Sequence, residues 1–291
     1  MVKVLLLLLS ILFTFSACSS QNKKPLIIAT NQWIGYAPLF YAYEKGELDK
    51  LNIRLINRTS LAEAADLYSI GKVDMVTTTQ HEYNMLKKST HDIAPIILLD
   101  RSNGGDMILS NKSIQQLSQA HKIYAYLEID SINQELLIEF IKHNNINKSK
   151  MVYIDKDQKQ IQDLKNNTAK NILIVTYSPY DIILKEKGFQ EIASTKDINS
   201  LIVIDALSAT NKVIKTDKKR LIALKKIIDK AIKSIQKDPK VSYPLVRKHL
   251  GNISYTEYVN SLKLIKWINK PSTNLLKRIE KYGYNKEDII Q

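Results

Sequence analysis

The regular alternation of short apolar runs with helical patterns limits the fold of this sequence more than any other feature. The first apolar runs lie at 25–30, 53–57, 73–78 and 94–99, and helical patterns separate most of them. Short apolar runs that alternate with helices are typical of buried, mostly parallel strands covered by helices. The sequence therefore predicts an α/β fold, with one such unit in residues 25–105 and a helix at 39–50.

A second series of the same kind begins near residue 108. Its predicted strands lie at 123–126, 151–154, 172–176, 192–194 and 201–206. After residue 217 the pattern predicts only helices, at 218–236, 241–249, 255–267 and 273–282. Two comparable α/β units in 291 residues predict two lobes. Ligands of such sheets bind where loops converge beyond the carboxyl ends of the strands, so we expect a cleft between the lobes.

Residues 1–17 have the layout of a secretory signal peptide. Lys3 precedes an apolar run from Val4 to Phe15, and small residues follow at Ser16 and Ala17. As a helix this run is about 20 Å long, which is too short for a hydrocarbon core of about 30 Å. A permanent transmembrane anchor is therefore the weaker interpretation.

Cys18 is the only cysteine of the chain, so it has no partner for an internal disulfide. The four residues that end at Cys18, FSAC, resemble a bacterial lipobox, with Phe15 in place of the usual leucine. The resemblance implies cleavage before Cys18 and attachment of lipid to it, with residues 18–24 as a flexible tether. A plain signal peptide followed by an incidental cysteine is the alternative.

The net charge is +14, and the lysines are scattered along the chain, somewhat more densely after Lys212. Nucleic-acid binding is disfavoured, because it needs a concentrated basic stripe with interleaved aromatic residues. A lysine-rich solvated surface explains the charge best. Attraction to anionic phospholipid headgroups near a membrane is the alternative.

Four motifs follow one another along the chain: NQWIGYAPL at 31–39, SIGKVD at 69–74, DRSNGGD at 100–106 and TYSPY at 176–180. In their order and spacing they resemble the NMT1/THI5-like (SsuA/TauA-like) group of ABC-transporter substrate-binding proteins. The resemblance covers roughly residues 25–206. It implies the type II periplasmic-binding-protein fold, in which two lobes are joined by two crossing strands and close around a ligand.

The same resemblance places the crossings near residues 104–109 and 194–202. Lobe 1 is then expected to hold residues 25–105 and 203–291, and lobe 2 residues 106–202. The resemblance also implies an exported monomer that delivers a small molecule to an ABC permease and its ATPase. Ligands of the group include sulfonates, nitrate, bicarbonate and thiamine-pyrimidine precursors.

Loops beyond the predicted strands carry the candidate ligand-binding residues. The aromatic candidates are Trp33, Tyr36, Tyr177 and Tyr180. Their rings could hold a planar ligand or a cation, or could simply pack in the core. The polar candidates are Thr78, Thr79, Asp100, Ser102 and Asp106. Turn formation, helix capping and hydrogen bonding to loop amides are the alternative roles of these polar residues.

The charge of these loops favours a nitrogen-containing ligand over an anion. Arg101 is the only arginine among them, whereas sulfonate or nitrate capture favours a cationic or amide-rich lining. Ser131 could open a helix whose amides face an anion, but Glu128 and Asp130 beside it would repel one. We therefore expect a neutral or cationic organic ligand, and a pyrimidine-like heterocycle fits that description.

An enzyme and a sensor are the rival classes of function. The five histidines have no triad-like or metal-ligand spacing, and no glycine-rich phosphate motif occurs. The sequence therefore predicts no catalytic residue, no cofactor and no metal site. A sensory binding protein that passes its closed form to a receptor would have the same fold and ligand site. That alternative stays open beside the transport of sulfonate- or nitrate-type anions.

Overall fold

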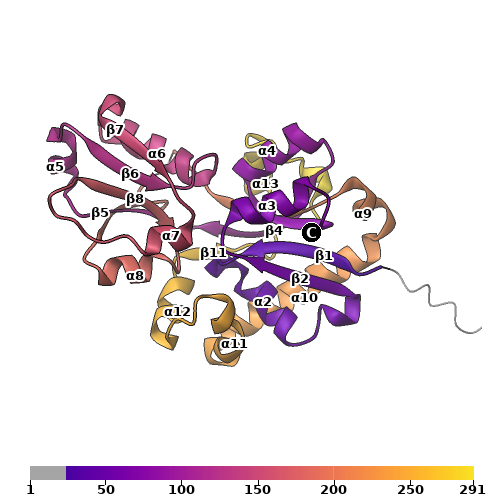
Figure 1. Ribbon diagram of the computed structural model, residues 1–291. Coiled ribbons are helices and arrows are strands. Elements are labelled where there is room, and N and C mark those ends of the chain that lie inside the picture. The colour runs from indigo at the N-terminus through magenta and orange to yellow at the C-terminus, as the bar shows by residue number, and fades with distance from the viewer. Residues whose placement is uncertain (1–23, 199) are drawn as a thin grey trace, which may run out of the picture.

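The computed structural model describes residues 24–198 and 200–291, which fold into two α/β lobes (Figure 1). The predicted signal peptide, Cys18 and the tether up to residue 23 lie outside the described residues. Each lobe is built around one sheet, and helices cover the sheets.

Lobe 1 contains a six-stranded sheet in the order β11-β4-β10-β3-β1-β2. Its strands are β1 (Leu26–Asn31), β2 (Ile53–Arg58), β3 (Met75–Thr79), β4 (Ala94–Ser102), β10 (Ile204–Ala209) and β11 (Ile265–Trp267). Its helices are α2 (Ala37–Glu44), α3 (Leu61–Ser69), α4 (Gln80–Thr90), α9 (Asn211–Thr216), α10 (Lys218–Lys237), α11 (Pro239–Val246), α12 (Tyr255–Leu262) and α13 (Thr273–Glu280).

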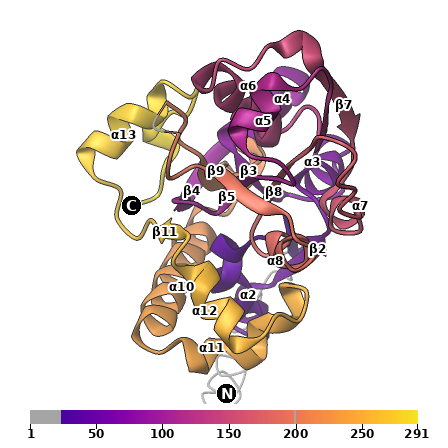
Figure 2. The same cartoon turned by 90° about the vertical axis from the view of Figure 1, so that its left-hand side faces the viewer.

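The helices after β10 pack on the first part of lobe 1, although they are distant in sequence. Figure 2 shows α10, α11 and α12 gathered near α2. Leu224, Ile228 and Ile232 recur at helical spacing on α10 and share one core with Leu39 and Phe40 of α2. This apolar stripe explains why the long lysine-rich helix is held against the lobe.

Lobe 2 contains a five-stranded sheet in the order β7-β6-β8-β5-β9. Its strands are β5 (Asp106–Ser110), β6 (Ile123–Leu127), β7 (Met151–Asp155), β8 (Ile172–Tyr177) and β9 (Gln190–Ser194). Its helices are α5 (Ile114–Gln119), α6 (Ile132–His143), α7 (Gln158–Gln162) and α8 (Asp181–Glu186). In both lobes, no helix of the described residues combines the length and apolar character needed to cross a membrane.

The two-lobed α/β architecture predicted from the sequence is confirmed, and its sheets are mixed rather than mostly parallel. In lobe 1, β1 pairs in parallel with β2 and β3, whereas β10 runs antiparallel to β3 and β4. In lobe 2, β6 pairs in parallel with β7 and β8, whereas β5 runs antiparallel to β8 and β9. The direction changes because β10 and β5 each enter their sheet from the other lobe.

The chain crosses between the lobes at residues 103–105 and 195–203. The two crossings are bonded to each other, because Ser102 Oγ lies 2.7 Å from Thr195 Oγ1 and the Gly104 amide donates to that oxygen over 2.9 Å. The Asp106 amide donates to Ser102 Oγ over 3.0 Å. These bonds hold the crossings side by side and define the hinge between the lobes.

Two helices end earlier than the sequence predicts. The helix predicted at 39–50 ends at Glu44, because Gly46 adopts a φ of +67°, where a right-handed helix cannot continue. The helix predicted at 255–267 ends at Leu262, and residues 265–267 form β11 instead. These three residues pair with the edge of β4, and Trp267 Nε1 donates to the Gly35 carbonyl over 2.8 Å. Tertiary contacts therefore decide this strand.

Candidate ligand-binding site

A small cavity lies between the lobes, where the carboxyl ends of β1, β3 and β8 converge. It is lined from lobe 1 by Asn31, Trp33, Tyr36, Leu61, Thr79 and Asp205, and from lobe 2 by Asp106 and Tyr177. We call it the inner cavity. Its volume is about 10 Å³, which is room for about one water molecule. The two lobes are thus closed on each other.

Strand register explains why carboxylates and aromatic rings meet at this cavity. Asp205 at the start of β10 pairs with Thr79 at the end of β3 and with Asp100 in β4. In lobe 2, Asp106 at the start of β5 pairs with Tyr177 at the end of β8. Directly paired residues of neighbouring strands project from the same face of a sheet, so their side chains are neighbours.

Trp33 is clamped by close contacts that only glycine permits. Its indole Nε1 donates to Asp100 Oδ1 over 3.1 Å, and the side chain is buried. A Cβ atom on Gly35 would lie 2.1 Å from Asp100 Oδ2, and one on Gly105 would lie 2.4 Å from Trp33 Cη2. The two glycines therefore let the indole and the carboxyl occupy the space beside the hinge.

Two aromatic rings, Tyr177 and Tyr180, continue from this tryptophan across the interface. Trp33 meets Tyr177 edge to face with ring centroids 5.8 Å apart, and Tyr177 meets Tyr180 in the same way at 5.4 Å. The side-chain amide of Asn31 in lobe 1 donates through Nδ2 to the Tyr177 hydroxyl of lobe 2 over 3.2 Å. Tyr36 donates its hydroxyl hydrogen to Asp205 Oδ1 over 2.5 Å. The cavity wall is therefore aromatic and hydrogen-bonded on both sides.

Five carboxyl side chains are buried at or near the inner cavity: Glu82, Asp100, Asp106, Glu128 and Asp205, none more than 5% exposed. Burial raises the pKa of Asp100 to about 8, that of Asp106 to about 7 and that of Glu128 to about 8. Burial and then the charge of Asp100 raise the pKa of Asp205 well above its ordinary value. The residues that line the described cavity include no lysine or arginine. These carboxyls therefore keep their protons to a higher pH than ordinary ones, and any that ionise do so without a lining cation to neutralise them.

Several buried acceptors near the cavity have no hydrogen-bond partner among the described residues. They include Asn31 Oδ1, Asp106 Oδ2, Glu128 Oε2 and Asn133 Oδ1. Asn31 and Asp106 line the inner cavity from opposite lobes. An unpaired buried acceptor is costly, so a group with N–H donors gains by binding here.

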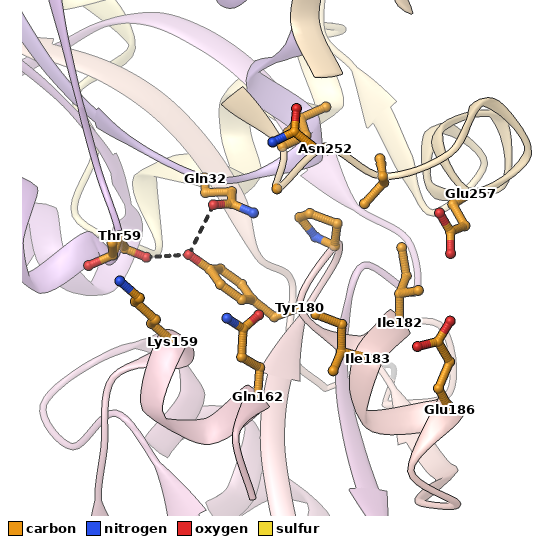
Figure 3. A pocket seen from close by; sticks show the side chains of 14 residues that line it. Gln32, Thr59, Lys159, Gln162, Tyr180, Ile182, Ile183, Glu186, Asn252 and Glu257 are labelled. Atoms are coloured by element: carbon orange, nitrogen blue, oxygen red, sulfur yellow. Dashed lines mark hydrogen bonds between the residues drawn. The ribbon is translucent and has the colours of Figure 1, made fainter. Parts of the chain in front are cut away.

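A larger groove opens between the lobes beside the inner cavity, and Figure 3 shows the side chains that line it. We call it the outer groove. Its volume is about 420 Å³. Its lining combines charged, amide and apolar side chains, among them Gln32, Thr59, Lys159, Gln162, Tyr180, Ile182, Ile183, Glu186, Asn252 and Glu257. Both lobes contribute to it.

Tyr180 forms the boundary between the outer groove and the inner cavity. Its ring contacts Tyr177, which lines the inner cavity, and Tyr180 itself lines the outer groove. From the start of α8 in lobe 2, its hydroxyl donates to the Thr59 carbonyl of lobe 1 over 2.7 Å and lies 3.4 Å from Gln32 Oε1 (Figure 3). These contacts tie the lobes together where the two spaces meet.

The structure brings together most of the residues predicted for the site. Five of them line the inner cavity: Trp33, Tyr36, Thr79, Asp106 and Tyr177. Tyr180 lines the outer groove, and Asp100 lies against Trp33. Thr78 bonds Ser208 inside the sheet of lobe 1, Oγ1 to Oγ at 3.3 Å, and Ser102 belongs to the hinge. Those two residues therefore lie outside both spaces, and ligand contact by any of the nine stays a prediction.

Sequence reasoning missed Asn31, Glu82, Glu128 and Asp205 as members of the site. Asn31 is the first residue of the motif at 31–39 and directly follows the strand predicted at 25–30, so its position was an available signal. Asp205 stands at the start of its strand, and its approach to Asp100 depends on an antiparallel pairing that no local pattern reveals. Glu82 lies within the first turn of α4 and looks like an ordinary capping residue in sequence.

Solved structures of other proteins share this fold at low sequence identity. A ligand-binding component of an ABC-type import system from Staphylococcus aureus, with zinc bound, aligns with a TM-score of 0.71 at 15% identity over 92% of this chain and 97% of that chain. The aliphatic sulphonate-binding protein SsuA from Escherichia coli gives 0.71 at 12% identity over 90% and 86%. The nitrate-binding protein NrtA from Synechocystis gives 0.64 at 12% identity over 92% and 69%.

No protein-family model and no curated protein sequence matches this chain. The structural similarity defines the fold: the chain has the type II periplasmic-binding-protein fold that the sequence predicts, with two lobes and a ligand cleft between them. Among the described residues, no group of three or more His, Cys, Asp or Glu side chains could hold a metal ion. The described cavity brings together hydrogen-bond acceptors and aromatic rings from both lobes.

Proposed function

We propose that this chain is an extracytoplasmic solute-binding lipoprotein of an ABC importer, and that it captures a small nitrogen-containing ligand between its lobes. The observation that carries the ligand class is the pair of unpartnered acceptors, Asn31 Oδ1 and Asp106 Oδ2, which line the inner cavity from opposite lobes. A ligand with two N–H groups can bond both at once and so hold the lobes together.

The surrounding charge favours a cation or a protonatable heterocycle. Asp106 is buried beside other carboxyls, and no lysine or arginine lines the described cavity to neutralise it. A positively charged nitrogen would supply that charge, and the ring of Trp33 or Tyr177 would face it or a planar ring that carries it. A pyrimidine-like amine fits both requirements. Because the inner cavity now holds about 10 Å³, such a ligand requires the lobes to close less completely than they do here.

Lobe closure about the hinge at Ser102 and Thr195 supports a transport cycle. A ligand that bonds both lobes favours a state in which they close around it, somewhat less completely than here, and therefore shifts the population toward that state. The permease and its ATPase are then expected to receive the closed, loaded form. Cys18 would carry the lipid that keeps the protein at the membrane, outside the cytoplasm, so we expect Cys18→Ser to abolish lipidation, which metabolic labelling with a fatty acid measures.

Other functions agree less well with the site. Sulfonate or nitrate would meet buried carboxyl groups and unpartnered acceptors without a lining cation, which opposes anion binding. A ligand sensor that feeds a receptor would use the same cavity, and neighbouring genes for a permease and an ATPase would favour transport over it. An enzyme on this fold has weaker support, because no serine, cysteine, histidine or lysine lines the described cavity.

A thermal-shift screen tests the ligand class directly. The panel comprises pyrimidines, amines, amino acids, sulfonates, nitrate and bicarbonate, measured at pH 8. A compound that binds only the folded protein raises the melting temperature by mass action. We expect a rise with pyrimidines or amines alone; a rise with sulfonate or nitrate alone would contradict the proposed ligand class.

A further inference from the structure

The amino end of α6 in lobe 2 is occupied by a carboxylate from lobe 1. Glu82 Oε1 accepts a hydrogen bond from the Ile132 amide, the first residue of α6, over 3.1 Å. The first amides of a helix lack partners within the helix and carry partial positive charge, so this position attracts anions. The chain therefore supplies its own carboxyl group at this position, next to Thr79, which lines the inner cavity.

The other early amides of α6 are also bonded within the chain. The Asn133 amide donates to Ser131 Oγ over 3.1 Å, and the Gln134 amide donates to the Ser131 carbonyl over 3.0 Å. With Ile132 bonded to Glu82, the three leading amides all have partners. An external anion would have to displace one of these bonds.

Glu82 is fixed in this position by its own helix start. Its second carboxylate oxygen accepts from the Thr79 amide over 3.1 Å and from the Thr79 hydroxyl. The side chain is only 4% exposed. One carboxylate thus caps α4 in its own lobe and α6 in the other, so it adds a contact between the closed lobes.

A second carboxylate repeats the arrangement within lobe 2. Glu128 Oε1 accepts from the Gln158 amide at the start of α7 over 3.2 Å. Its other oxygen, Oε2, has no partner among the described residues. Both buried carboxyl groups therefore occupy amide-rich positions at helix starts. Burial and, to a smaller extent, the charge of Glu82 raise the pKa of Asp106.

We propose that Glu82 determines which sign of charge the cleft accepts: by filling the amino end of α6, it excludes anions and favours cations. This inference deepens the proposed function and rests on it for the cation. The exclusion of anions rests on the bond between Glu82 and Ile132 alone, so the two parts can fail separately.

The test compares methanesulfonate binding to the wild-type protein and to Glu82→Ala. Both are used as the cell produces them, and tryptophan fluorescence or calorimetry reports binding. Removing the carboxylate frees the Ile132 amide, so we expect Glu82→Ala to bind methanesulfonate at least about tenfold more tightly than wild type. Equal affinity in the two proteins would overturn the inference.

Two further variants separate occupation of the amide from simple loss of charge. Glu82→Gln keeps an oxygen that can accept from Ile132, so its affinity for methanesulfonate should change less than about threefold. If Glu82→Gln gained as much affinity for methanesulfonate as Glu82→Ala, this would contradict the proposal that Glu82 excludes anions by occupying the Ile132 amide. Glu135→Ala is the matched control, because Glu135 also makes a contact between the lobes, with its Oε1 2.5 Å from His81 Nδ1, but it is not the carboxylate that accepts from the Ile132 amide. Its affinity for methanesulfonate should not increase.

Glu82→Ser gives a second measurement if Glu82→Ala does not fold. Its hydroxyl can still cap Thr79 but is too short to reach the other lobe, so the same tenfold gain is expected. If the truncated variants bind methanesulfonate while no nitrogen compound binds wild type, the role of Glu82 is supported and the proposed cationic ligand is contradicted. If wild type binds an amine or pyrimidine while the variants bind methanesulfonate no more tightly than wild type, the cationic ligand is supported and the role of Glu82 is contradicted.

Discussion

The inner cavity and the outer groove lie side by side between the same two lobes, yet they differ in size, charge and exposure. The inner cavity has a volume of about 10 Å³ and is bordered by buried carboxyls, whereas the outer groove has about 420 Å³. Lys159 and Glu186 of the outer groove carry opposite charges and are exposed to solvent. Water screens charges in the groove, but burial makes each charge in the cavity energetically important.

The difference teaches that size alone does not identify the recognition site. The groove has the volume typical of ligand pockets, but its polar side chains are solvated or bonded. The cavity is small, but it contains unpartnered acceptors on both lobes. We therefore expect the cavity to decide affinity and the groove to serve as the approach to it, with Tyr180 between them.

Asp106→Asn should produce the largest effect on ligand binding. The change keeps the size of the side chain but removes the charge and one acceptor at the cavity. We expect the affinity for the pyrimidine or amine found in the screen to fall by about 30-fold or more, measured by calorimetry. The melting temperature of the unliganded variant at pH 8 should not fall, because a buried charge is removed.

A fall in ligand affinity of less than about twofold for Asp106→Asn would contradict the assignment of recognition to the inner cavity, since the charge of Asp106 would then contribute little to binding. The same result with a lower melting temperature would assign Asp106 a structural role at the start of β5.

The pH dependence of stability should also come from the inner cavity. The pKa values of Asp100 and Glu128 are raised to about 8 and that of Asp106 to about 7, from 3.8 or 4.5. Between about pH 4 and pH 8 the folded protein therefore binds more protons than the unfolded chain, and the free energy of unfolding decreases as pH rises. We expect the melting temperature of the unliganded protein to drop by about 5 °C or more from pH 5 to pH 8.5, measured by calorimetry.

The affinity for a cationic ligand should rise with pH over the same interval, because the ligand binds the ionised carboxyls and competes with protons for them. Asp106→Asn should flatten both this pH dependence of affinity and the pH dependence of the melting temperature. A melting temperature that rises from pH 5 to pH 8.5 would contradict the assignment of these buried carboxyls.

Tyr180→Phe tests the boundary between the two spaces. The variant keeps the ring against Tyr177 but removes the hydroxyl that donates to the Thr59 carbonyl of the other lobe. Loss of one interlobe hydrogen bond is expected to raise the ligand dissociation rate by about fivefold, measured by stopped-flow fluorescence. An unchanged rate would show that the boundary does not hold the closed state.

Substitutions in the outer groove should have the smallest effect. Lys159→Ala and Glu186→Ala remove exposed charges of opposite sign, which are screened by solvent. We expect each to change the ligand affinity by less than about twofold, measured in the same calorimetric assay. A tenfold loss in either variant would move the recognition site from the cavity to the groove.

Much of the fold could be predicted from local pattern, because buried strands and amphipathic helices leave a periodic trace. The strand before Trp33 and the helix after Asp217 both follow from such traces. The strand at 265–267 could not be predicted, because it exists only as a partner for the edge of β4. The pattern after residue 254 resembles a helix, and for this reason the sequence predicts a helix over 255–267.

The candidate site divides in the same way. Trp33, Asp106 and Tyr177 stand in loops or at strand ends, where residues of two-lobed α/β proteins meet a ligand, so their positions were predictable. Ser102 stands in a similar motif but serves the hinge through Thr195, 93 residues away. Sequence pattern alone does not distinguish a residue at the hinge from one at the cavity beside it.

The sequence by itself determined the α/β class, the two-lobed organisation and the acidic and aromatic character of the loops, because periodicity and residue type are local properties. Only the tertiary structure decided that Asp205 stands beside Asp100, that Glu82 reaches the start of α6 and that Tyr180 closes against Thr59. Each of these contacts joins segments far apart in the chain. Their geometry depends on strand register and lobe closure, which packing of the whole molecule sets.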